Sequence, residues 1–159
     1  GDSGRNTLNK VKLELNQMVS EVCEESQMID QKHRYLFRGT DPAYMTGDIA
    51  MIKQSIRIFV QNEAKYSSDG ADITLGVMLE SGYVSYMIQD EGIGMESSDV
   101  VHIFERFYRS DEARNGETGG SGLGLSIAKW IVDAHSGTIQ VVSRPEIGTR
   151  FIVRFPMCE

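Results

Sequence analysis

The segment from Asn62 to Tyr66 brings together an asparagine, a lysine and a tyrosine near the end of a stretch with helical periodicity. Residues three and four apart share a helix face, so Asn62, Lys65 and Tyr66 are expected to point the same way. A carboxamide oxygen, an ammonium group and an aromatic ring would suit a magnesium-bound polyphosphate on a heterocycle. The same residues also fit a solvated last turn of a helix, where a lysine complements the helix dipole.

Asp90 directly follows a strand-like segment and is followed by Glu91-Gly92-Ile93-Gly94. A carboxylate at a strand end can accept a hydrogen bond from the exocyclic amine of adenine, whereas guanine would present an oxygen there. Gly92 and Gly94 permit unusual backbone angles and a close approach to a flat ligand. An ordinary glycine-rich turn is the alternative for this segment.

A glycine-rich stretch, Gly-Gly-Ser-Gly-Leu-Gly-Leu-Ser at 119–126, leads directly into a segment with helical periodicity. Glycines before a helix N-terminus leave several N–H donors in a positive dipole, so even an acidic protein can hold a triphosphate there. No Gly-Lys-Ser/Thr closes the stretch and no strand immediately precedes it, which excludes a P-loop and a dinucleotide-binding fingerprint. A flexible linker is the alternative. The residues concerned are Gly120, Ser121, Gly122, Leu123 and Gly124.

The sequence at 103–109, Ile-Phe-Glu-Arg-Phe-Tyr-Arg, places three aromatic residues inside the long connection between 90 and 124. These aromatic side chains fit two roles: they anchor the connection to the core, or they form a docking face for a partner. In the second case Arg106 or Arg109 would be free to bind a phosphate group.

Three helices and five strands are expected to position these segments. Helical periodicity covers about 15–30, 49–67 and 122–135, and strand patterns cover 33–37, 73–80, 83–89, 138–143 and 149–155. Hairpins outnumber crossover units, which predicts an α+β fold: a two-layer sandwich of one mixed, mostly antiparallel sheet with helices on one face. The glycine-rich connection at 90–124 is long for a simple link and is typical of a functional loop.

The composition excludes several classes of protein. The chain has 159 residues, with 16 Lys and Arg against 23 Asp and Glu and a net charge of −7, so no nucleic-acid-binding face is expected. No apolar run reaches the roughly 18 residues of a membrane span, and no leader pattern opens the chain. The two cysteines, Cys23 and Cys158, fit a reducing compartment. We therefore expect a cytoplasmic domain without direct membrane contact.

Together and in this order, these segments resemble the ATP-binding catalytic domain of bacterial sensor histidine kinases. The wider superfamily includes gyrase-type topoisomerases, heat-shock chaperones and MutL-like proteins. The resemblance covers about 18–155 and rests on an asparagine box, two glycine boxes, a phenylalanine box and the closing Gly148-Thr149-Arg150-Phe151. It implies a helical layer on a mixed sheet, with a flexible lid over ATP at about 95–119.

The resemblance also implies roles for individual residues. Asn62 would bind Mg²⁺, Lys65 would approach the phosphates, and Asp90 would bind adenine. The catalytic residues implied are Asn62, Lys65 and Arg109. The residues implied to bind ATP are Asn62, Lys65, Tyr66, Asp90, Gly92, Ile93, Gly94, Gly120, Ser121, Gly122, Leu123 and Gly124.

Some positions depart from the family pattern. Ile58 stands where these kinases often carry a second asparagine, and where the chaperones and topoisomerases carry a water-activating glutamate. Glu63 lies beside Asn62 and is expected to point roughly 100° away from it around the helix. Efficient ATP hydrolysis is therefore not expected. Glu91 and the sequence His135-Ser136-Gly137 are further departures, and neither replaces a central ligand.

The resemblance implies an ATP-dependent protein-histidine kinase fragment that lacks its phosphoacceptor. His33, His102 and His135 lie outside any acceptor segment, so the γ-phosphoryl group would go to a histidine on a separate dimerisation domain. A response regulator would act downstream. Residues 1–14 are expected to be a linker stub from the dimerisation domain and 15–159 the catalytic domain, with a monomeric fragment and a homodimeric, membrane-anchored parent. A degenerate ATP-binding regulatory module and a conformational ATPase remain the alternatives.

Overall fold

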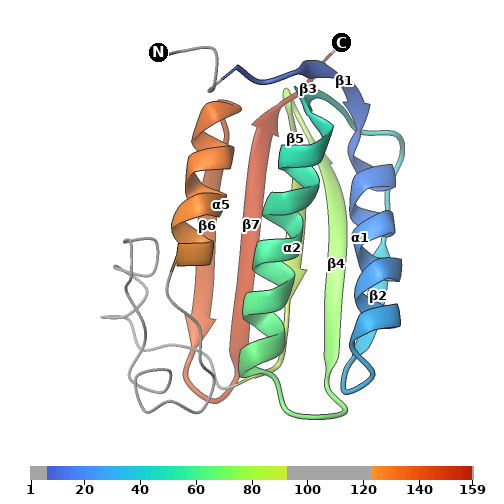
Figure 1. Ribbon diagram of the computed structural model, residues 1–159, viewed down its shortest axis with the longest axis vertical. Helices are drawn as coiled ribbons and strands as arrows, with labels where there is room; N and C mark the ends of the chain where they lie inside the picture. The colour runs from blue at the N-terminus through green and yellow to red at the C-terminus, as the bar shows by residue number, and fades with distance from the viewer. Residues whose placement is uncertain (1–6, 93–122, 159) are drawn as a thin grey trace.

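The computed structural model describes residues 7–92 and 123–158, which form two layers (Figure 1). The elements in chain order are β1 (Lys10–Glu14), α1 (Leu15–Ile29), β2 (Arg34–Arg38), β3 (Tyr44–Asp48), α2 (Ile49–Tyr66), β4 (Asp72–Glu80), β5 (Tyr83–Gln89), α5 (Leu123–Ala134), β6 (Thr138–Arg144) and β7 (Gly148–Pro156). The three expected helices and five expected strands are confirmed, within one or two residues at each end. None of the helices in the described ranges is long and apolar enough to cross a membrane.

The main sheet has the strand order β2-β4-β5-β7-β6. β2 and β4 run parallel, and the other three pairs are antiparallel. The helices α1, α2 and α5 cover a single face of this sheet (Figure 1). The predicted α+β sandwich with a mixed, mostly antiparallel sheet is therefore confirmed.

The structure differs from the sequence-based expectation at the start of the domain. The segment Lys10–Glu14, expected to belong to a linker, forms strand β1 and pairs with β3 in a separate two-stranded sheet. Leu13 in β1 is buried in the hydrophobic core. β1 leads directly into α1, where the Glu14 carboxylate caps the helix by accepting hydrogen bonds from the backbone N–H groups of Asn16 and Gln17. The folded unit therefore extends before residue 15.

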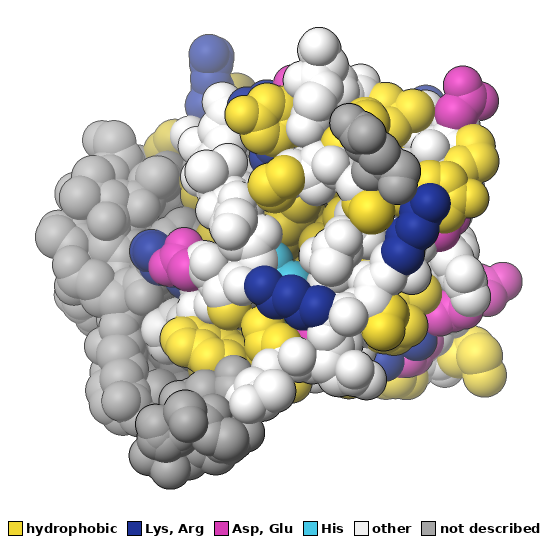
Figure 2. Space-filling model, turned by 90° about the horizontal axis from the view of Figure 1, so that it is seen from above, with side chains coloured by type: hydrophobic (Ala, Val, Ile, Leu, Met, Phe, Trp, Pro, Cys, Tyr) yellow, Lys and Arg dark blue, Asp and Glu magenta, His cyan; other side chains and the backbone are white. Residues whose placement is uncertain are grey.

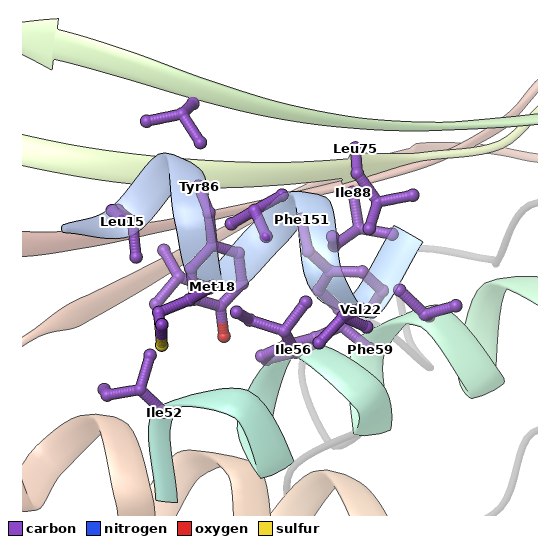
Figure 3. Close-up of a cluster of buried hydrophobic side chains, with 14 of the residues drawn as sticks. Leu15, Met18, Val22, Ile52, Ile56, Phe59, Leu75, Tyr86, Ile88 and Phe151 are labelled. Carbon is purple, nitrogen blue, oxygen red and sulfur yellow. The ribbon is translucent and has the colours of Figure 1, made fainter. Parts of the chain in front are cut away.

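The core lies between the helices and the sheet (Figure 3). α2 contributes Ile52, Ile56 and Phe59, which face the sheet and α1 because they recur at helical spacing. Phe59 packs against Phe151 of β7 with ring centroids 4.7 Å apart. Tyr86 of β5 is fully buried, and its hydroxyl group is hydrogen-bonded to Ser55 of α2 at 2.8 Å. This packing fixes the position of α2 over β5 and β7.

The two ends of the sandwich differ in character. α2 and β5 end, and α5 and β7 begin, at the end away from the chain termini (Figure 1). At the terminal end, a hollow is lined by residues that include Lys10, His135 and Cys158 (Figure 2). There the backbone N–H of Asp48 donates to Nε2 of His135, so this imidazole ties the start of α2 to the end of α5. His135 therefore has a structural role in the fold.

His33 precedes β2 and joins this strand to the last turn of α2. Its Nδ1 lies 2.6 Å from the Asp30 carboxylate, and its Nε2 lies 3.1 Å from the carbonyl oxygen of Ser67. Both ring nitrogens thus face acceptors, which favours the doubly protonated imidazolium. Burial opposes this charge, but the hydrogen bonds to Asp30 and Ser67 outweigh burial and raise the pKa of His33 above its ordinary value.

This contact predicts a dependence of stability on pH. A raised pKa in the folded state adds stability that is complete below the unfolded-state pKa of about 6.5 and is lost as the pH rises through the folded-state pKa. The free energy of unfolding should therefore fall on going from about pH 6 to pH 8 more steeply in the parent chain than in a His33→Gln variant. Urea unfolding of both proteins across this range measures the difference. Parallel pH profiles would contradict a charged His33.

Candidate functional site

Asp90 lies directly after β5 and has two carboxylate oxygens in different environments. Its side chain is buried, with 4% of the residue exposed. Oδ1 accepts hydrogen bonds from the backbone N–H groups of Thr149, at 2.9 Å, and Gly92, at 3.1 Å. Oδ2 is also buried, but it has no hydrogen-bond partner among the described residues. The backbone therefore holds this carboxylate in one orientation and leaves one oxygen available for a ligand.

Two glycines allow the backbone around Asp90 to close up. A Cβ atom at Gly92 would overlap the carbonyl oxygen of Tyr66, so Gly92 brings the chain after β5 against the end of α2. Gly148 has a φ of 140° and lies against the carbonyl oxygen of Asp90 in the same way. The sequence predicted that Gly92 allows a close approach to a flat ligand. In the structure, the group that Gly92 closely approaches is the backbone of Tyr66. Ile93 and Gly94 lie outside the described residues.

Thr149 is a site residue that the sequence analysis cited only as part of a motif. Its N–H binds the Asp90 carboxylate, and its carbonyl oxygen accepts the backbone N–H of Asp90 at 3.0 Å. These bonds continue the β5–β7 ladder by one more residue pair beyond Gln89 and Arg150. The pairing of two strands distant in the sequence thus places Thr149 beside Asp90.

Glu63 is buried and interacts electrostatically with Asp90, which its expected direction away from Asn62 did not indicate. The residue is 0% exposed, and neither carboxylate oxygen has a hydrogen-bond partner among the described residues. Burial and then the charge of Asp90 raise the pKa of the Glu63 carboxyl well above its usual range. The spacing of Glu63 along the chain could have indicated that it is buried. It follows Ile56 by seven residues and Phe59 by four, which places it on the buried face of α2.

Asn62, Lys65 and Tyr66 come from the last turns of α2, as expected. Asn62 and Tyr66 are partly buried, and Lys65 is exposed. Lys65 lines a groove of about 300 Å³ between α1, α2 and the start of β2, together with Asp30 and other residues. Among the described residues that line this groove, neither Asp90 nor Glu63 appears.

The start of α5 lies against α2 one turn before Asn62. A Cβ atom at Gly124 would lie 3.6 Å from Cγ2 of Ile58, which is ordinary van der Waals contact. Ile58 is buried in the hydrophobic core, so the position one turn before Asn62 is apolar. Leu123 is the first residue of α5. The remaining site residues expected from the sequence, Arg109, Gly120, Ser121 and Gly122, lie outside the described ranges, as does the expected lid at 95–119.

Comparison with known proteins identifies this arrangement. A family model described as "Histidine kinase-, DNA gyrase B-, and HSP90-like ATPase" matches residues 47–159. The chain belongs to this ATPase family. This ATPase domain is 37% identical over 143 residues to the sensor histidine kinase YkoH of Bacillus subtilis, covering 90% of the chain. It is 36% identical over 130 residues to the sensor protein CiaH of Streptococcus pneumoniae, covering 80% of the chain.

Solved structures of histidine kinases share the fold of this ATPase domain. The mycobacterial sensor histidine kinase MprB superposes with a TM-score of 0.81 at 24% identity, covering 92% of this chain and 97% of that one. The catalytic domain of histidine kinase ThkA gives a TM-score of 0.80 at 23% identity, covering 94% and 98% of the two chains. The match with YkoH covers 31% of that protein and the match with CiaH 29%, so the chain spans about a third of these curated relatives.

Proposed function

We propose that the chain binds Mg·ATP and transfers the γ-phosphoryl group to a histidine on a separate dimerisation domain, as part of two-component signal transduction. The observation that carries the proposal is the Asp90 carboxylate, with Oδ1 held by two N–H groups and Oδ2 buried without a partner among the described residues. The sensor histidine kinases among the relatives support the same reading. A structural neighbour, full-length ShkA, was solved in complex with AMPPNP.

Asp90 would select adenine through its unpartnered oxygen. An ionised carboxylate only accepts hydrogen bonds, so Oδ2 can accept the exocyclic amine of adenine but would be repelled by the O6 oxygen of guanine. A buried hydrogen bond to a charged group is stronger than one between neutral groups. The two backbone hydrogen bonds on Oδ1 mean that little orientation entropy is lost when the base binds.

Asn62 is the proposed protein ligand of Mg²⁺. Mg²⁺ prefers oxygen ligands and commonly takes only one or two from the protein, with phosphates and waters completing the octahedron. A single partly buried carboxamide fits this pattern, and the described residues hold no group of three or more His, Cys, Asp or Glu that could bind a metal by itself. When bound with ATP, the ion would neutralise phosphate charge.

The remaining residues would position the phosphates for transfer. Gly124, the second residue of α5, lies next to α2, so the N-terminal N–H groups of α5 would face the phosphates together with Gly120, Ser121, Gly122 and Leu123. Lys65 and Arg109 would supply positive charge when the phosphates bind.

The apolar Ile58 offers no proton acceptor one turn before Asn62, which favours transfer to a docked histidine over hydrolysis. The chain before β1 would connect to the dimerisation domain of a homodimeric, membrane-anchored parent, with a response regulator downstream.

Titration of the chain with nucleotides tests this proposal. We expect ATP to bind with micromolar to millimolar affinity, more tightly with Mg²⁺ than without it, and more tightly than GTP. Hydrogen exchange with and without Mg·ATP should show slower exchange at the amides of Gly92 and Thr149 and across 95–119. Calorimetry that detects no ATP binding, or unchanged exchange at all of these amides, would refute the nucleotide site.

A further inference from the structure

A groove lies between α1, α2 and the start of β2, in the helical layer of the domain. The two helices pack side by side over the sheet (Figure 1), and the groove has a volume of about 300 Å³. Small-molecule sites in proteins begin at about this size. Among the described residues that line the groove, Lys65 is the only one that the sequence analysis assigned to the nucleotide site. The proposed function therefore leaves most of the groove without a role.

Part of the groove wall is apolar. Val60 and Ala64 lie one turn apart on α2, and Ile29 is the last residue of α1. Ile29 is largely in contact with solvent, with 78% of the residue exposed. A ligand that covers this wall removes apolar surface from water, which is favourable. The groove therefore suits a ligand with an apolar body.

The two carboxylates that line the groove are already paired within the protein. Glu25 accepts two hydrogen bonds from the guanidinium group of Arg57, at 2.6 and 3.1 Å. Asp30 accepts a hydrogen bond of 2.6 Å from the hydroxyl group of Tyr35, and it lies 2.6 Å from Nδ1 of His33. These contacts use the negative charge of the groove, so neither carboxylate is left to pair with a lysine.

Two lysines line the same groove, and their ammonium groups have no partner in the described ranges. The chain has six lysines, all of which the structure describes. Four of them have a partner within the protein: a carboxylate, a carbonyl oxygen or an aromatic ring. These four are Lys10, Lys12, Lys53 and Lys129. The other two, Lys32 and Lys65, are exposed and both line the groove. In a chain with a net charge of −7, two unpaired cations beside an apolar wall point to an anionic ligand.

We propose that the groove binds a small apolar anion, an aromatic or aliphatic molecule that carries one carboxylate, sulfonate or phosphate group. The anionic group would pair with the ammonium groups of Lys32 and Lys65, and the apolar body would cover Ile29, Val60 and Ala64. Charge and apolar surface would then be matched at the same time, as in most small-molecule sites. The contacts need no bound nucleotide, so the inference stands apart from the proposed function and is tested on the nucleotide-free chain.

Nuclear magnetic resonance titration with three probes separates the charged and apolar parts of this recognition. 1-Naphthoate, an aromatic carboxylate, should cause saturable shifts at the backbone amides of Ile29, Lys32 and Ala64 with a Kd of about 1 mM, which is typical of a ligand of this size. 1-Naphthalenemethanol keeps the rings but has no charge, so it should bind about tenfold more weakly, because it loses two exposed ion pairs. Acetate keeps the charge but has no rings, and it should cause no saturable shifts at these amides.

Lysine variants assign the binding to the groove. Lys32→Gln should weaken 1-naphthoate binding about threefold, and the double variant Lys32→Gln/Lys65→Gln about tenfold. Lys129→Gln is the matched control, because it removes a lysine that is paired with Asp133 on α5, and it should leave the affinity unchanged. All three lysines are exposed, so the variants should fold, and their spectra verify this.

Three results would overturn the inference. The first is the absence of saturable shifts at the groove amides with 1-naphthoate. The second is equal affinity for 1-naphthoate and either of the other two probes, which for acetate would mean an adventitious ion only. The third is an undiminished affinity in the double variant. Failure of the chain to bind ATP would refute the proposed function and would leave each of these results unchanged.

Discussion

An Asp90→Asn variant is expected to bind ATP about 10- to 150-fold more weakly than the parent chain, a loss of about 1.5–3 kcal/mol of binding free energy. The contacts of Asp90 give the reason. The amide oxygen of an asparagine would accept the N–H groups of Gly92 and Thr149, as Oδ1 does now. The amide NH₂ would then take the place of Oδ2 and face the N6 amine of adenine. An attraction would become a contact between two donors.

The same variant should discriminate less well against GTP. An NH₂ group in the place of Oδ2 can donate to O6 of guanine, which the carboxylate repels. Calorimetry of the parent chain and the variant with both nucleotides measures this effect. Asp72→Asn is the matched control, because it removes a partly exposed carboxylate that pairs with Arg34 at the surface, and it should leave both affinities unchanged. If Asp90→Asn keeps the ATP affinity and selectivity of the parent chain, Asp90 does not recognise the base.

Asn62→Ala is expected to reduce phosphoryl transfer at least about 100-fold. The variant removes the only metal ligand proposed for the protein, and positioning with charge neutralisation supplies most of the catalysis in phosphoryl transfer. The assay supplies the histidine-bearing dimerisation domain of the parent in trans with γ-labelled ATP, and it follows acid-labile, base-stable label on that domain. Gln61→Ala, at an exposed neighbouring position on α2, is the matched control and should transfer at the parental rate.

The chain alone is expected to take up no label, because none of its histidines lies in an acceptor segment. His33 and His135 are both buried and hydrogen-bonded within the fold. Ile58 leaves water without a general base one turn before Asn62. Rapid ATP hydrolysis by the chain alone, with no label on the partner domain, would therefore favour a conformational ATPase over a kinase. Transfer at the parental rate by Asn62→Ala would show that the metal has another ligand.

Periodicity along the chain was sufficient to predict most of the elements. The apolar residues of α2 recur at helical spacing, and an acidic N-cap at Asp48 marks its start. The hairpin of β4 and β5 combines strand-forming residues with a tight turn, where Gly82 takes a positive φ of 79°. These signals are local, because they depend on neighbouring residues only. They fixed the helices and the hairpin before any contact between elements was known.

The strands β1 and β3 could not be predicted in the same way. Each has five residues, and their pairing joins Lys10 to Asp48 and Glu14 to Tyr44, far apart in the sequence. β1 is mostly exposed and shows little alternation, and both strands are stabilised mainly by a partner strand that a local pattern does not reveal. The expected linker at 1–14 therefore contains a strand of the folded unit.

The features of the candidate site also fall into two groups, those that depend on the local sequence and those that depend on the tertiary structure. The sequence by itself determined that Asp90 follows a strand and that Asn62 ends a helix, because both features depend on local periodicity. Only the tertiary structure decided that Thr149 and Gly92 bind one oxygen of Asp90, and that the buried Glu63 interacts with the Asp90 carboxyl group. These contacts depend on the pairing of β5 with β7 and on the packing of α2 over the sheet. Partners that meet across such distances in the chain are set by long-range packing, which neighbouring residues do not encode.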